Sequence, residues 1–377
     1  MSNFIGSNLY FARMLNDLTL QDLANKIGLT KQYIQYLESE TKTPQSQTID
    51  LLSQFLYVNN DFFTNPLSNI PLEQIHFRKR KIIPIKIQNT FVAKINIIQK
   101  IIKYLESKIN IPDIKLPNKN TDVNFYSLNI EQITKDIRKE WNLGKDPIPN
   151  LSVILENRGC IILSMNDIID KIDACSIDLE RPIIVRKKNS NICRTRFTEG
   201  HELGHIILHK GMETGDNETE NQANRFSSAL LLPEESFRQE FSFLLNCRRI
   251  DNFLIDKLIN LKFRWGVSSS AIFRRAFDLE MIDSEKYKNI CITYNTKIYN
   301  KSKKDGEKEK GDDDFSKNSK IREESNNFLN AIDILNIHNL IPELLNCLSI
   351  KKELLEKQID YKIVENKGNI ININFKK

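Results

Sequence analysis

The chain has 377 residues, of which 40% are apolar and 28% charged, so it can bury enough apolar surface for two or three domains. Its formal charge of +6 is small beside 55 basic and 49 acidic residues, and it decides nothing about a nucleic-acid partner. The six cysteines lack CxxC spacing, no apolar run is long enough to span a bilayer, and the first residues do not resemble a signal peptide. We therefore expect free thiols, no membrane partner and a cytoplasmic location.

Residues 1–66 show short amphipathic helical patterns separated by single turn residues. In the stretch TLQDLANKIGLTKQYIQYLE, Thr19 and Thr30 are each placed to cap a helix, and Gly28 supplies the turn between the two helices. This layout resembles the Xre/Cro/C1-type repressor domain over about residues 4–64. The resemblance implies an all-α helix-turn-helix domain.

In that family the second helix of the pair enters the major groove of DNA. The resemblance therefore implies contacts with base edges or phosphates from one helix, with Gln21 at the DNA backbone; the other residues implied are Thr30, Lys31, Gln32, Tyr33 and Gln35. The charge of this domain argues against DNA binding, because residues 1–66 contain four basic and six acidic side chains. A helical bundle used for dimerisation is the alternative, since fold alone does not fix function, and a homodimer is compatible with either.

Composition divides the rest of the chain. Residues 67–120 hold eight Lys or Arg between Arg78 and Lys103 and no acidic residue there, and from Phe91 the apolar positions recur at helical spacing. That basic connecting helix and linker either contacts phosphates or forms a solvated helix face. Further along we expect a mixed domain with a small sheet, a charged disordered linker and a C-terminal segment of unassigned role, at 121–295, 296–325 and 326–377. The expected fold class is α+β, mainly α.

The stretch RFTEGHELGHIILH contains two histidines four residues apart. On a helix, His201 and His205 lie one turn apart on the same face, so both can direct a ring nitrogen at one ion. Glu202 is offset to the side, where its carboxylate can take a proton from water without binding the metal. The motif also arises by chance, and histidines satisfied at the edge of a core are the alternative interpretation.

A catalytic zinc site needs a third protein ligand, and the stretch ENQANRFSSALLLP offers one. Glu220 precedes Asn224 by four residues on a second helical pattern, so both side chains project on one face. Asn224 can then hold a ligand histidine in one tautomer. His209 follows His205 by one turn, but three successive helical histidines converge poorly on one ion, and we interpret it as structural.

The order of five blocks across about residues 125–285 resembles the ImmA/IrrE metallopeptidases. These blocks are RKEWNLGKDPIPNLSVILENRGCIIL, RPIIV, RFTEGHELGHIILH, ENQANRFSSALLLP and RWGVSSSAIFRRAFDLEMI. The resemblance implies a minimal zincin fold and zinc-dependent endopeptidase activity of gluzincin-like type. It implies Zn²⁺ bound by His201, His205 and Glu220, with Glu202 as the general base. Characterised members cleave a partner repressor of the Xre type.

The chain departs from that family at three positions without losing a ligand. Glu199 and Gly200 stand where small apolar residues are common, and Gln222 stands where a second acidic residue is frequent. Two functional hypotheses therefore follow. The first is a DNA-binding regulatory zinc metallopeptidase that cleaves a cognate repressor, or itself, in a mobile-element, stress or phage-defence setting. The second is an Xre-type regulator whose zincin domain is a non-catalytic sensor or scaffold.

Overall fold

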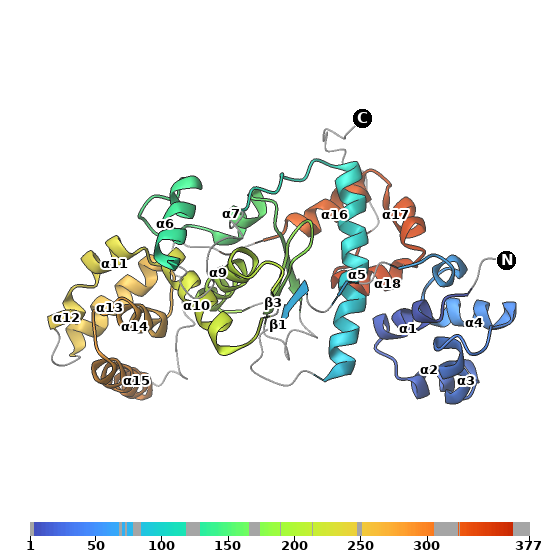
Figure 1. Ribbon diagram of the computed structural model, residues 1–377, viewed down its shortest axis with the longest axis horizontal. Helices are drawn as coiled ribbons and strands as arrows, with labels where there is room; N and C mark the ends of the chain where they lie inside the picture. Colours follow the sequence, from blue (N-terminus) through green and yellow to red (C-terminus); the bar gives the residue numbers. More distant parts are fainter. Residues whose placement is uncertain are drawn as a thin grey trace. The chain divides into compact units, whose positions relative to one another are not determined.

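The computed structural model describes residues 4–364 with gaps at 68–69, 72–73, 78–83, 118–128, 166–173, 189, 213, 247–250, 305–322 and 324. The chain divides into two compact units. A helical unit contains residues 1–72, 81–111 and 326–377, and a mixed unit contains residues 73–80 and 112–325. Figure 1 shows the helices and strands of both units.

The helical unit begins with four short helices and one turn of 3-10 helix. These are α1 (Gly6–Leu15), α2 (Leu20–Ile27), α3 (Lys31–Glu38), α4 (Ser46–Leu56) and η1 (Asn60–Phe63). Thr19 accepts a hydrogen bond from the backbone N–H of Asp22, whose carboxylate accepts one from the N–H of Thr19. Gly28 ends α2 in the left-handed region with φ of 70°, and Thr30 caps α3. The predicted helix-turn-helix geometry is confirmed.

A buried ion pair ties α1 to α3. Arg13 donates from Nε to Glu38 Oε1 at 2.6 Å and from a terminal nitrogen to Oε2 at 2.8 Å. It also donates to the carbonyl oxygen of Leu18 at 2.9 Å. The two charged side chains are only 6% and 12% exposed, so Arg13 is committed to the fold and is withdrawn from any contact with DNA.

The connecting helix and the C-terminal helices belong to the same unit as the helix-turn-helix. Helix α5 (Ile85–Lys108) packs against α1, α17 (Ile341–Leu348) and α18 (Lys352–Ile359), and α16 (Asn327–Ile337) precedes them. Gln358 donates to the carbonyl oxygen of Leu15 at 3.0 Å, which joins the last helix to the first. The helix expected from Phe91 is confirmed and starts earlier. The basic residues 78–81 lie outside the described residues.

The mixed unit contains a four-stranded sheet in the order β1-β3-β4-β2. The strands are β1 (Ile75–Phe77), β2 (Ile161–Met165), β3 (Ala174–Ile177) and β4 (Ile183–Lys187). Strands β2 and β4 are parallel, and the other two pairs are antiparallel, with His76 opposite Ser176. The expected strands at CIIL and RPIIVRKK are confirmed as β2 and β4, and the fold class is α+β, mainly α.

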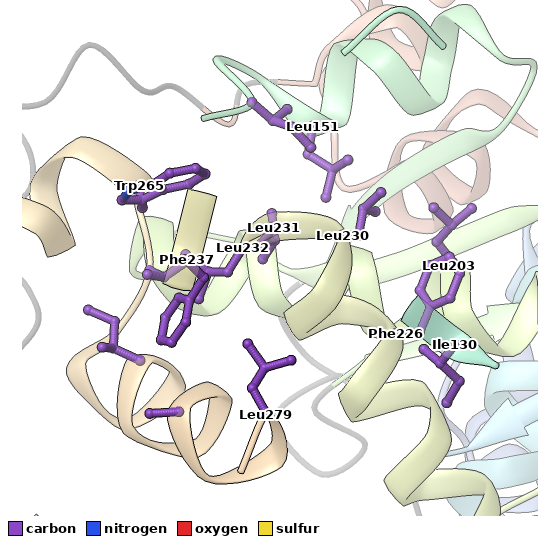
Figure 2. Close-up of a cluster of buried hydrophobic side chains, with 14 of the residues drawn as sticks. Ile130, Leu151, Leu203, Phe226, Leu230, Leu231, Leu232, Phe237, Trp265 and Leu279 are labelled. Carbon is purple, nitrogen blue, oxygen red and sulfur yellow. The ribbon is translucent and has the colours of Figure 1, made fainter. Parts of the chain in front are cut away.

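The helices of the mixed unit contribute to its apolar core. They are α6 (Ile130–Glu140), α7 (Leu151–Asn157), α9 (Ile192–Leu208), α10 (Asn217–Leu231), α11 (Glu234–Glu240), α12 (Phe243–Asn246), α13 (Asn252–Trp265), α14 (Ser269–Asp278) and α15 (Ser284–Lys304). Of these, α7 and α9 contact the sheet directly. Figure 2 shows Leu203 of α9 and Phe226 of α10 among the buried side chains. Helix α15 continues past residue 296, where the charged linker was expected to start. The greater part of that linker, 305–322, lies outside the described residues.

Replacing Glu38 with alanine leaves Arg13 as a buried unpaired charge, and we expect the helical unit to lose about 3–5 kcal/mol of unfolding free energy. Both tryptophans, Trp141 and Trp265, lie in the mixed unit. Tryptophan fluorescence during urea unfolding therefore follows the mixed unit, whereas far-ultraviolet circular dichroism follows both units. Dichroism should register an earlier loss of helix in the variant.

Lys357→Ala provides the control for this measurement. Lys357 forms an exposed ion pair with Asp17 at 2.8 Å, and exposed pairs contribute little to stability. This variant should unfold like the unmodified chain. An unchanged dichroism transition in Glu38→Ala would contradict the role given to the buried pair.

Candidate functional site

Close packing between α9 and α10 brings the predicted site residues together. A Cβ atom added to Gly200 would lie 2.6 Å from Ser227 Oγ, and one added to Gly204 would lie 3.2 Å from the Cα of Ala223. Both glycines therefore permit an approach that larger residues would prevent. The approach sets the first turns of α10 beside the histidines of α9.

The three predicted metal ligands converge. His201 and His205 direct their Nε2 atoms at each other across 3.0 Å. The carboxylate of Glu220 places Oε2 3.7 Å from His201 Nε2 and Oε1 3.5 Å from His205 Nε2. Among the described residues, this is the group of three whose ligand atoms lie close enough together to hold a metal ion. Two imidazole nitrogens and one carboxylate are donors that suit zinc.

Asn224 occupies the position expected beside the first ligand. Its Oδ1 lies 3.0 Å from Nδ1 of His201. Because an amide oxygen only accepts, Nδ1 carries the proton and Nε2 of a neutral ring presents a lone pair toward the other ligands. The Nε2 lone pair of His201 thus faces Nε2 of His205, 3.0 Å away, and the carboxylate of Glu220. A bound cation stabilises such a group of electron-rich atoms. The residues present therefore fit a zinc ion.

Glu202 lies beside the ligands and is only 1% exposed. Its Oε2 accepts a hydrogen bond from the hydroxyl of Ser176 on β3 at 2.8 Å. Burial, reinforced by the Glu202 carboxylate, raises the pKa of the neighbouring Cys175 thiol well above its ordinary value. Cys175 is therefore a protonated residue of the core. Ser176 gave no signal in the sequence, because β3 has only four residues and no distinctive pattern.

A histidine far from the motif in sequence also reaches the site. His76 of β1 is 2% exposed, its Nδ1 lies 2.9 Å from the hydroxyl of Thr214, and its ring stacks on that of His205 at 5.6 Å between centroids. Burial, with smaller contributions from His205 and His209, lowers the pKa of His76 to about 4, so the ring is neutral at neutral pH. Its position in a basic segment 125 residues before the motif gave no signal in the sequence.

His209 is fully buried and does not join the ligand group. Its Nδ1 lies 2.9 Å from Nδ1 of His205, on the side of that ring away from the other ligands. Its Nε2 lies 3.0 Å from Oε1 of Gln222. His209 is therefore a partner of the predicted ligand His205, and Gln222 is a partner of His209.

A buried ionic cluster compensates the unusual glutamate at position 199. Glu199 receives hydrogen bonds from Arg186 of β4 at 2.6 Å and from Ser152 of α7 at 2.9 Å. Glu323 accepts the backbone N–H of Ser152 at 2.9 Å and pairs with Arg196. Burial raises the pKa of Glu199 to about 8, against the opposing effect of Arg186 and with reinforcement from Glu323. The departure from small residues at this position is thus matched by partners on two other segments, β4 and α7.

The residues predicted to contact DNA lie on α2, on α3 and at the residue before α3. Gln21, Thr30, Lys31, Gln32 and Gln35 are exposed, and Tyr33 is half-buried. Lys42 lies over the ring of Tyr33 at 5.8 Å, so a cation flanks this exposed face of α3. With Arg13 committed to Glu38, the remaining basic side chains of residues 1–66 are Lys26, Lys31 and Lys42.

Two helices that carry a His-Glu-x-x-His motif and a glutamate opposite it define a metallopeptidase-type site. Comparison with known families agrees: residues 159–277 match the IrrE N-terminal-like domain, and residues 9–59 match a helix-turn-helix domain. The chain therefore joins an Xre-like helix-turn-helix domain to a peptidase domain of the ImmA/IrrE type. No curated protein matches the chain. Among the described residues, no helix is long and apolar enough to cross a membrane.

Replacing Gly200 with alanine should force α9 and α10 apart. The new Cβ would overlap Ser227, and we expect a loss of about 1–3 kcal/mol in the unfolding free energy of the mixed unit, followed by tryptophan fluorescence. The double variant with Ser227→Gly should recover most of the loss, because the overlapping side chain is then absent. Simple additivity of the two single changes would show that the helices do not depend on this contact.

Proposed function

We propose that the chain is a DNA-binding regulatory zinc endopeptidase that cleaves a cognate repressor-type protein, or itself, and thereby controls transcription. The convergence of His201, His205 and Glu220, with Glu202 beside them, carries the proposal. These residues come from two helices held by close packing, so the site is formed before a substrate arrives.

The first three residues would hold the zinc ion. When bound, zinc acts as a Lewis acid that lowers the pKa of water and polarises a peptide carbonyl. The carboxylate of Glu202 accepts a proton from the attacking water and passes it to the leaving amine nitrogen. Ser176 donates to Oε2 of Glu202, which fixes the orientation of the carboxylate.

The helix-turn-helix would bring the chain to its target. Its exposed α3 face suits the major groove of DNA, and its fold suits pairing with a repressor of the same kind or with a second copy of the chain. The alternative is an Xre-type regulator whose zincin domain senses or scaffolds and does not cleave. The exposed polar face of α3 favours DNA binding under both hypotheses. The two hypotheses therefore differ in whether the zincin domain cleaves a protein.

Glu202→Gln should abolish cleavage and keep the metal. Removing a general base typically lowers a rate by about 10²–10⁴-fold. Cells producing the unmodified chain or the variant are compared by sequencing new protein amino termini, and intact mass reports cleavage of the chain itself. Zinc per purified chain is measured in parallel, and His201→Ala should lose it.

Absence of any new amino terminus that depends on Glu202 would favour the non-catalytic regulator. Absence of zinc from the unmodified chain, or normal zinc in His201→Ala, would overturn the metal site itself. Both results leave the DNA-binding half of the proposal open to its own test.

DNA binding should depend on the exposed start of α3. With an operator selected from random DNA, Lys31→Ala should weaken binding to all sequences and reduce the salt slope by about 1, as loss of a phosphate contact does. Gln32→Ala, if Gln32 reads a base, should cost about 1–3 kcal/mol at one position of the operator. Lys357→Ala, on α18, is the matched control for charge. Equal losses in all three variants would exclude specific reading by α3.

A further inference from the structure

The second metal ligand is held from behind by another histidine. His205 directs Nε2 at His201 and Glu220 and Nδ1 at Nδ1 of His209, 2.9 Å away. When two ring nitrogens share one hydrogen bond, one donates and the other accepts. The direction of this bond decides which nitrogen of His205 carries the proton, and therefore whether Nε2 can bind a metal.

The direction of the hydrogen bond between His205 and His209 is set by the contact that the other ring nitrogen of His209, Nε2, makes with Gln222. Gln222 donates from Nε2 to the carboxylate of Glu218 at 2.9 Å. Because an ionised carboxylate only accepts, the Gln222 amide cannot be turned round without facing its oxygen at that carboxylate. Oε1 of Gln222 therefore faces Nε2 of His209 at 3.0 Å, and Nε2 of His209 is the donor.

The proton on Nε2 of His209 determines where His205 carries its own proton. A neutral His209 with its proton on Nε2 has a lone pair on Nδ1, which accepts from Nδ1–H of His205. Nε2 of His205 is then left with its lone pair toward Glu220. We propose that His209, Gln222 and Glu218, named here the relay, are positioning residues that hold His205 in its metal-binding tautomer. This inference rests on the proposed metal site.

Burial makes the hydrogen bonds of the relay costly to lose. His205, His209 and Gln222 are 2%, 0% and 6% exposed, so water does not replace a lost partner and an unmade hydrogen bond is costly. His201 obtains the same result from Asn224 alone. His205 instead reaches the amide oxygen of Gln222 on α10 through His209, which lies four residues further along α9.

The relay also gives a physical reason for glutamine at position 222. An amide can accept from His209 and donate to Glu218 at the same time, whereas a carboxylate can only accept. The exposed Glu218 thus fixes the orientation of the Gln222 amide, and the amide in turn fixes which ring nitrogen of the buried His209 carries the proton. A carboxylate at 222 would accept from His209 directly and would not need Glu218.

The test compares zinc affinity in four variants of the full chain by competition with a chelator. Gln222→Met and His209→Phe remove the relay, and affinity should fall by about 10–100-fold, as loss of such hydrogen-bond partners does at other metal sites. Gln222→Glu keeps an acceptor for His209 and should bind zinc like the unmodified chain. Asn221→Ala, an exposed neighbour on α10, is the control and should also bind normally.

A spectroscopic signature separates positioning from simple packing. The chain has five histidines, and their ¹⁵N signals in the metal-free protein, at about pH 8 where an ordinary ring is neutral, distinguish a proton on Nδ1 from one on Nε2. His205 should carry its proton on Nδ1 in the unmodified chain and in Gln222→Glu. A mixture of both tautomers is expected in Gln222→Met.

Either of two results would overturn the inference. One is a metal-free unmodified chain with the His205 proton on Nε2, a measurement that needs no variant to fold. The other is unchanged zinc affinity in a folded Gln222→Met. If the unmodified chain binds no zinc, the proposed function fails, while the tautomer of His205 still tests the relay.

Discussion

Helices α9 and α10 approach so closely that a side chain at Gly200 would overlap Ser227 and one at Gly204 would be tightly crowded by α10. This constraint brings the proposed metal ligands together in one packed pair of helices. Each helix contributes a pair of residues four apart, His201 with His205 and Glu220 with Asn224, and the pairs meet only because the helix axes are near. Small residues in the contact thus contribute as directly to the site as the ligands, although they touch no ligand atom.

Helix α9 carries unusual numbers of charged and polar side chains into the core. Glu199, Glu202 and Arg196 are all at most 1% exposed, and each has its partner on a different segment. Glu202 is bound by β3, Glu199 by β4 and α7, and Arg196 by Glu323. A buried charge without such a partner would be strongly destabilising, so the sheet, α7 and the segment at 323 are required for this helix to stay where it is.

Local spacing explains which parts were predictable from the sequence. The helix caps at Thr19 and Thr30 and the paired motifs on α9 and α10 depend on residues three to four apart, which the sequence displays directly. Ser176 and His76 lie on β3 and β1, which have four and three residues and are too short for a distinct pattern. The acceptor for His209 required knowing how α9 and α10 pack, and the grouping of α5 with the last three helices required knowing contacts across more than 200 residues.

The order of the two units along the chain has a consequence for synthesis. The mixed unit is complete once residue 325 has been made, whereas the helical unit waits for residues 326–377, whose helices pack on α5 and whose Gln358 holds the end of α1. As a chain emerges from the ribosome, the segment with the proposed metal ligands can therefore fold before the helix-turn-helix unit has all its parts. A nascent chain passes through a stage in which the peptidase domain is finished and its DNA-binding neighbour is not.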